Sequence, residues 1–214
     1  MKKEIAKALL FVIIFASSFS CMDNENRRLH FDKQIVVDSL LSNHQTSPGQ
    51  YKIRMQAFKA ERILEVYLST SNADWTKVRS YPFCNFSGDL GPKLKEGDRQ
   101  IPEGIYKIKV FNPKSKFYLS MGLDYPNARD MKIADPEHPG SDIYIHGGCR
   151  TVGCIPITDE KIAELYLMSK TAEKDIEVII LPYKPSIENH NRFAEKYPQH
   201  QAFWGALFSD AKVI

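Results

Sequence analysis

The chain has 214 residues, with 29 Lys and Arg against 26 Asp and Glu, a net charge of +3 and 43% hydrophobic residues. This charge balance argues against a nucleic-acid-binding arm, and the apolar content excludes an intrinsically disordered chain. The length suits one globular domain with an appendage. We therefore expect no nucleic-acid partner.

The N-terminus predicts a secretory signal peptide over residues 1–20. Three lysines within the first seven residues precede an apolar run over residues 8–16, which is about half of the roughly 20 apolar residues that a membrane-spanning helix needs. Cys21 follows directly and suits lipid attachment in a bacterial lipoprotein, although Phe19 and Ser18 fit such a signal less well. We expect an exported, periplasmic protein that meets a membrane only through a lipid on Cys21. The alternative is ordinary cleavage with a free Cys21.

Removing this segment leaves 194 residues with 26 basic and 25 acidic side chains, so charge identifies no partner. Beyond Cys21, three cysteines remain: Cys84, Cys149 and Cys154. An odd number of cysteines in an oxidising compartment suggests that one thiol is kept for chemistry.

The mature chain divides into three predicted parts. Residues 21–55 read as a tether and a short helix, residues 56–185 as the main domain, and residues 186–214 as a helical extension in two pieces split by Pro198. The short helix is suggested by four apolar residues spaced like one helix face: Phe31, Ile35, Leu40 and Leu41. The extension carries aromatic residues that we interpret as core packing: Phe193, Tyr197, Phe203, Trp204 and Phe208.

The main domain reads as short strands separated by Gly and Pro turns, which predicts a mainly antiparallel sandwich or barrel. Six strands are expected over residues 63–68, 75–84, 104–110, 117–121, 143–145 and 176–180. One helix interrupts them. Thr158 is its predicted N-cap, Asp159 and Glu160 suit the positive end of its dipole, and one face is apolar apart from a serine: Ile162, Leu165, Tyr166 and Ser169.

The segment SDIYIHGGCRTVGC, residues 141–154, carries the candidate chemistry. A strand brings His146 to a glycine-rich loop that ends in Gly153 and Cys154 just before the helix. Thiolate catalysis needs a basic partner for the sulfur and glycines that let backbone N–H groups approach an oxyanion. The pattern therefore favours a thiol enzyme.

Two alternatives use the same residues without catalysis. His146, Cys149 and Cys154 can bind zinc, but a structural zinc site needs four ligands and no second Cys pair is present. A structural disulfide can also join Cys149 to Cys84 or to Cys154, and the sequence does not decide between these pairings.

His-Gly followed by Gly-Cys on a strand, loop and helix resembles the L,D-transpeptidase catalytic-domain family, bacterial enzymes that build or edit peptidoglycan cross-links. Further segments resemble the murein L,D-transpeptidase branch in the same order, and the similarity covers about residues 60–182. These segments are residues 84–93, 96–98, 102–106, 123–127 and 153–154. The resemblance implies an L,D-transpeptidase-like β-sandwich or barrel with one helix after the catalytic Cys and helical extensions at both ends.

The resemblance also implies roles for two residues: Cys154 as the nucleophile and His146 as proton donor and acceptor. The commoner motif has a second His two residues before the Cys and an Arg two residues after it, where this chain has Val152 and Pro156. Arg150 is our candidate replacement for the missing Arg, and the alternative is a solvated loop Arg.

Other loop residues are assigned supporting roles. Gly147, Gly148 and Gly153 are expected to shape the loop, with the N–H of Gly153 or Cys154 facing an oxyanion. Tyr144 joins Arg150 as a candidate substrate contact. The family needs neither a metal nor an organic cofactor.

The predicted function is ping-pong acyl transfer through a Cys154 thioester on peptidoglycan stem peptides. The alternative is an endopeptidase or amidase that hydrolyses cross-links or bonds between peptidoglycan and a wall-linked protein through the same Cys. A third hypothesis, motivated by the absent second His, is a catalytically silent wall-binding module.

Overall fold

The computed structural model describes residues 24–70 and 74–214. The predicted signal peptide and Cys21 lie outside these ranges and stay predictions. In the part of the chain that is described, no helix is long and apolar enough to cross a membrane. The strands are β1 (Lys52–Phe58), β2 (Ile63–Ser69), β3 (Thr76–Pro82), β4 (Gly104–Ser115), β5 (Tyr118–Leu123), β6 (Tyr144–His146), β7 (Ile155–Pro156) and β8 (Glu177–Leu181). The helices are α2 (Asn24–Asn43), α3 (Asp159–Thr171), α4 (Ile187–Lys196) and α5 (Gln201–Asp210), with short 3-10 turns η1 (Asp130–Lys132) and η2 (Pro198–His200).

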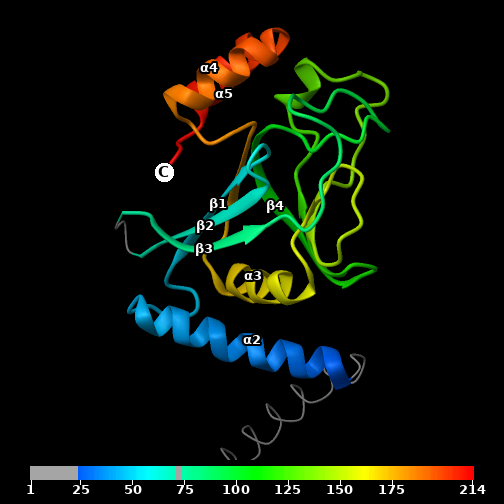
Figure 1. The fold of residues 1–214 in the computed structure, drawn as a ribbon. Helices are drawn as coiled ribbons and strands as arrows, with labels where there is room; N and C mark the ends of the chain where they lie inside the picture. The colour runs from blue at the N-terminus through cyan, green and yellow to red at the C-terminus, as the bar shows by residue number, and fades with distance from the viewer. Residues whose placement is uncertain (1–23, 71–73) are drawn as a thin grey trace, which may run out of the picture.

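The strands form one eight-stranded sheet in the order β3-β2-β1-β8-β4-β5-β6-β7. Only the β1–β8 and β6–β7 pairs are parallel, so the prediction of a mainly antiparallel sheet is confirmed. The 12-residue β4 pairs with β8 through residues 104–107 and with β5 through residues 108–115, with a register shift after Ile108. A bulge in a strand shared by two ladders bends a sheet. The sheet therefore curls at β4 (Figure 1), which gives the expected sandwich-like or barrel-like shape.

All six predicted strands are present, and two further strands, β1 and β7, were not predicted. β1 carries Arg54 and Gln56, which break its apolar pattern, although Gln56 is fully buried. β7 has only two residues, one of them Pro156. β1 also begins at Lys52, inside the range expected to be a tether and short helix.

The sheet is covered on both faces, which explains its continuous apolar strands. Along β8, Val178 and Ile180 belong to the main core, whereas Ile179 and Leu181 belong to a second core with Leu207 of α5. Successive strand residues point to opposite faces, so a strand covered on both faces is apolar throughout.

Helix α3 lies between the sheet and α2 (Figure 1). Residues 162–169 are all buried, which fits a helix enclosed on all sides rather than one with a single apolar face. Thr158 occupies the N-cap position as predicted, but its side chain makes no capping hydrogen bond and its φ is +72°.

Helix α2 is longer than the short helix that was expected, with 20 residues. Leu40 and Leu41 are buried as predicted, together with Val37. Phe31 and Ile35 are 66% and 55% exposed, so their assignment to the same buried face was wrong. At roughly 100° per residue, Phe31 and Ile35 lie off the stripe that faces α3.

The C-terminal extension folds as two helices separated at Pro198, as predicted. Its aromatic residues pack around Tyr183, which stacks on Phe193 with ring centroids 4.7 Å apart and meets Trp204 edge-on at 5.5 Å. The prediction that these rings serve core packing is confirmed, because Phe193, Tyr197 and Trp204 are buried and Phe203 and Phe208 pack, partly buried, against the same cores.

A fully buried ion pair lies beside the extension, between the residue that follows β1 and the residue that precedes β4. Lys59 Nζ lies 3.0 Å from Glu103 Oε1, and both side chains are inaccessible to solvent. Trp204 Nε1 donates to Glu103 Oε2 at 2.6 Å, and Gly91 N donates to Glu103 Oε1 at 2.7 Å. Lys59 also donates to the carbonyl oxygens of Gly91 and Ile101 at 2.8 and 2.9 Å. The polar atoms are thus satisfied, as burial of a charge requires.

Candidate active site

The parallel pairing of β6 and β7 brings His146 and Cys154 to one place. Ile145 pairs with Ile155 and His146 with Pro156, so Cys154 immediately precedes the strand that lies beside β6. A pocket of about 300 Å³ opens here, and both residues line it. The other lining residues are Phe117, Arg150, Thr151 and Val152. The two residues assigned to catalysis from the sequence therefore share one cavity.

Cys154 is a free, partly exposed thiol. Its Sγ accepts a hydrogen bond from the backbone N–H of Tyr144 and donates one to the carbonyl oxygen of Asp142, each at 3.4 Å. Burial raises the pKa of Cys154, with the Tyr144 N–H acting in the opposite direction. The resting sulfur is therefore a protonated thiol and needs a base before it can attack.

His146 is buried at the end of β6, and its ring lies 4.6 Å from the ring of Phe117, centroid to centroid. Its Nδ1 bonds to the carbonyl oxygen of Gly147 at 2.5 Å, which makes Nδ1 the protonated nitrogen and leaves Nε2 for proton transfer. Burial lowers the pKa of His146, while the Gly147 carbonyl and the charge of Asp159 oppose this. The imidazole is thus neutral at neutral pH and able to accept a proton.

Glycines are required at two positions of the loop between these residues. A Cβ on Gly147 would lie 2.5 Å from Asp159 Oδ1 and 2.7 Å from the carbonyl oxygen of Phe117. Gly153 has a φ of +97°, and a Cβ there would lie 2.9 Å from the carbonyl oxygen of Gln100. Residues with a side chain rarely adopt such a φ, so both the backbone conformation and the available space at Gly153 favour glycine.

Hydrogen bonds from neighbouring segments fix the backbone of the loop. Gly148 N donates to Asp159 Oδ1 at 2.7 Å, and Gly153 N donates to Ser87 Oγ at 2.7 Å. Cys154 N donates to Thr151 Oγ1 at 3.0 Å. The N–H groups of Gly153 and Cys154 are thus engaged within the protein, and their assignment to an oxyanion site stays a prediction. The Tyr144 N–H is the backbone donor beside the sulfur.

A disulfide joins Cys84 to Cys149, with their Cα atoms 5.5 Å apart. Of the two pairings that the sequence left open, the structure therefore has the one that leaves Cys154 free. Asn85 Nδ2 donates to the carbonyl oxygen of Cys149 at 2.8 Å and strengthens the same connection. The zinc alternative loses a ligand, because Cys149 is no longer a thiol.

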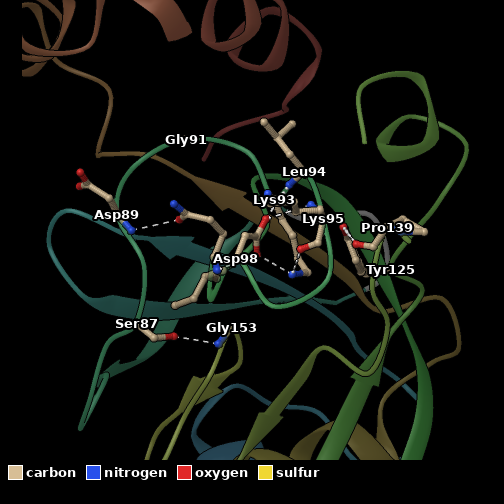
Figure 2. A network of polar contacts seen from close by, with 12 residues as sticks. Ser87, Asp89, Gly91, Lys93, Leu94, Lys95, Asp98, Tyr125, Pro139 and Gly153 are labelled. Atoms are coloured by element: carbon tan, nitrogen blue, oxygen red, sulfur yellow. Dashed lines mark hydrogen bonds and ion pairs between the residues drawn. The ribbon is translucent and has the colours of Figure 1, made fainter. Parts of the chain in front are cut away.

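Residues 83–101, which we call the strap, run from β3 towards β4 and hold the loop through Ser87 (Figure 2). Within the strap, Lys93 Nζ lies 2.6 Å from Asp98 Oδ1 and donates to the carbonyl oxygen of Lys95 at 2.9 Å. The Asp98 carboxylate also accepts from the backbone N–H groups of Leu94, Lys95 and Gln100. These bonds lower the pKa of Asp98 against the opposing effect of burial. The network gives the strap a fixed backbone shape.

Arg150 and Tyr144, the predicted substrate contacts, differ in position. Arg150 is exposed and lines the pocket beside Cys154. Tyr144 contributes its backbone N–H to Cys154, while its hydroxyl lies 3.4 Å from Asp142 Oδ1. Their contact with a substrate stays a prediction.

Sequence reasoning missed several residues that shape the site. Ser87, Thr151 and Asp142 contact the loop or the sulfur through hydroxyl or backbone atoms, which leave no pattern of charge or periodicity. Asp142 has a φ of +60°, which turns its backbone within this segment. Asp159 was assigned to the helix dipole, and its carboxylate in addition holds Gly148. Ser87 lies within residues 84–93, one of the segments that resemble the family, and this resemblance was the sequence feature that pointed to it.

Comparison with known proteins identifies the family of this chain. The YkuD family, described as the L,D-transpeptidase catalytic domain, matches residues 34–180. This chain therefore belongs to the L,D-transpeptidase catalytic-domain family.

Two individual proteins illustrate the relationship. The chain is 31% identical over 161 residues to the Escherichia coli K12 protein named "Putative L,D-transpeptidase YafK", a match that covers 72% of this chain and spans 63% of the length of YafK. The fold of this chain is similar to that in the crystal structure of the helical cell shape determining protein Pgp2 from Campylobacter jejuni, with a TM-score of 0.52. The sequence identity is 18%, and the match covers 81% of this chain and 68% of the Pgp2 chain.

Proposed function

We propose that this protein is a cysteine-dependent L,D-transpeptidase that acts on peptidoglycan stem peptides. The observation that carries the proposal is the free thiol of Cys154 and the neutral imidazole of His146 in one pocket of about 300 Å³. Family membership makes peptidoglycan the expected substrate.

The protonation states of the pair suggest how the reaction begins. Because burial raises the pKa of Cys154 and lowers that of His146, both groups start neutral. His146 Nε2 takes the thiol proton as Sγ attacks the carbonyl carbon of a stem amide. The C–N bond then breaks, the same proton passes to the departing amine of a D-amino acid, and a thioester remains on Cys154.

A second stem peptide completes the transfer. Its amine attacks the thioester carbonyl, His146 accepts the proton of that amine, and the proton returns to the sulfur as the thiol leaves. No metal or organic cofactor enters these steps. Export, a lipid on Cys21 and a periplasmic location belong to the same proposal.

Muropeptide mass spectrometry with the purified protein and a defined tetrapeptide tests the reaction type. Transfer predicts cross-linked dimers with release of a D-amino acid, and none with Cys154→Ala. Shortened or released stems without dimers would overturn transfer in favour of the endopeptidase or amidase. His146→Gln keeps a polar side chain of similar size and removes the base, so it should abolish dimers as well.

A further inference from the structure

A polar cavity of about 310 Å³ is lined partly by the strap and is separate from the pocket that contains Cys154. We call it the extension pocket, because α4 of the C-terminal extension forms one wall. The β1–β2 turn and the strap form the others. Phe86 lines this pocket, and the next residue, Ser87, holds Gly153 beside Cys154. The wall from α4 lies beyond residues 34–180, the part of the chain that matches the family.

Four basic residues line the extension pocket: Lys59, Arg62, Arg192 and Lys196. Lys59 is paired with the buried Glu103, and each of the other three lies over an aromatic ring. Arg62 lies 5.1 Å from the ring centre of Phe86, Arg192 5.2 Å from that of Phe193, and Lys196 5.1 Å from that of Tyr197. Across residues 24–70 and 74–214, no ion pair includes Arg62, Arg192 or Lys196. Aromatic faces hold a cation in place without cancelling its charge. Lys196 also interacts with the charge of Asp89, whereas Arg62 and Arg192 remain fully available to an anionic ligand.

The two carboxylates of the pocket accept hydrogen bonds within the protein and keep further lone pairs for a ligand. Glu61 accepts hydrogen bonds from the Lys184 backbone N–H and from Asn189 Nδ2, each at 3.2 Å. Asp89 accepts from the Tyr197 hydroxyl at 2.7 Å and so joins the strap to the extension. These bonds fix the pocket walls. They also place two carboxylates where they would repel a compact polyanion.

We propose that the extension pocket binds a peptidoglycan stem peptide through its carboxylate groups. Arg62, Arg192 and Lys196 receive the carboxylates, since a guanidinium pairs with a carboxylate through two parallel N–H bonds. Glu61 and Asp89 suit the amine and amide N–H groups of the same ligand, which a phosphate lacks. The volume is at the lower end of the range for small-ligand sites and suits a short peptide segment. The proposal rests on the proposed function for the ligand class.

Equilibrium binding tests the proposal without catalysis. The full chain carrying Cys154→Ala is titrated with a stem tetrapeptide bearing free carboxylates and with the same peptide amidated at each carboxylate. The test variant adds Arg192→Glu and Lys196→Glu. The control adds Lys132→Glu and Lys174→Glu, two exposed lysines outside both pockets that give the same change in net charge. Arg192→Gln with Lys196→Gln removes the charges without reversing them, and circular dichroism checks the fold.

The expected result is that the test variant binds the carboxylate peptide about tenfold more weakly than the control, as the loss of two charge-assisted bonds implies. Binding of the amidated peptide should change little. Equal binding of the carboxylate peptide by test and control variants would overturn the proposal, and so would no binding by the Cys154→Ala parent. If the protein with Cys154 intact forms no thioester but the variants differ as expected, the proposed reaction fails while the binding site stands.

Discussion

The strap has two sides that are held in different ways. Towards Cys154 it is joined to the loop by the Cys84–Cys149 disulfide and the bond between Ser87 and Gly153, in a partly exposed region. Towards the extension it meets the fully buried pair of Lys59 and Glu103.

The two sides of the strap are therefore held in place by different kinds of interaction. On the extension side, the buried network of Lys59 and Glu103 bonds directly to the backbone of the strap. On the active-site side, a covalent link and individual hydrogen bonds position a loop that still opens to a pocket. This arrangement lets a reactive segment stay accessible while its backbone stays fixed.

Lys59→Met should show the largest effect on stability, because it leaves Glu103 charged and buried without a cation. We expect the free energy of unfolding to fall by about 3–5 kcal/mol. Arg129→Met is the control, since it removes the exposed pair with Asp210 and should cost about 0–1 kcal/mol. Urea unfolding measures both. A similar small loss in both variants would show that the buried pair stabilises the extension side of the strap no more than an exposed pair does.

Removing the disulfide by Cys84→Ala with Cys149→Ala should lower the free energy of unfolding by about 2–4 kcal/mol. The crosslink spans 65 residues, so its loss frees a long loop of the unfolded chain. Cys154→Ala keeps the disulfide and serves as the control in the same urea experiment. A double variant as stable as the control would show that hydrogen bonds alone hold this side of the strap.

Gly153→Ala should lower kcat/KM about 100-fold, because its Cβ would push the residue before Cys154 away from the Gln100 carbonyl. Gly97→Ala is a matched control within the strap. Gly97 also has a positive φ, of +74°, but its Cβ would meet no atom within 4 Å. The control should lose only about 1 kcal/mol of stability through backbone strain. Equal losses of activity in both variants would mean that the close approach to Gln100 is unimportant.

The smallest predicted effect is the pH dependence contributed by His146. Its pKa is lowered in the folded protein, so the unfolded chain binds the proton more readily and stability is lost as pH falls below 6.5. One proton gives a slope of at most about 1.4 kcal/mol per pH unit. Urea unfolding between pH 7 and 5 should show a steeper loss for the parent than for His146→Gln. A ring NMR titration with a midpoint above 6.5 would contradict the lowered pKa.

Sequence patterns predicted the secondary structure correctly where successive residues are buried in a regular pattern. The run Ile176 to Ile180 indicated a strand because its four apolar residues each belong to one of two apolar cores. β1 escaped because Gln56 is a buried polar residue within the strand, and such a residue has no apolar signal. Phe31 was misassigned because hydrophobicity alone does not show which side of a helix is covered.

The two candidate catalytic residues could be predicted from the sequence, whereas the residues that hold the loop in position could not. His146 and Cys154 are close in sequence and carry a recognisable motif, so the sequence indicated them together. The partners of the loop come from distant segments, such as Ser87, which lies 66 residues before Gly153. The contact of Trp204 with Glu103 spans 101 residues. Contacts of this kind depend on the assembled sheet, and no local pattern encodes them.

The central claim is that Cys154 carries the acyl group. Intact-protein mass spectrometry after rapid quenching with a stem tetrapeptide, followed by peptide mapping, tests it directly. The prediction is an added mass equal to that of the tetrapeptide minus that of the released D-amino acid, located on Cys154 and absent from Cys154→Ala. Turnover by Cys154→Ala, or an adduct on any other residue, would contradict the claim.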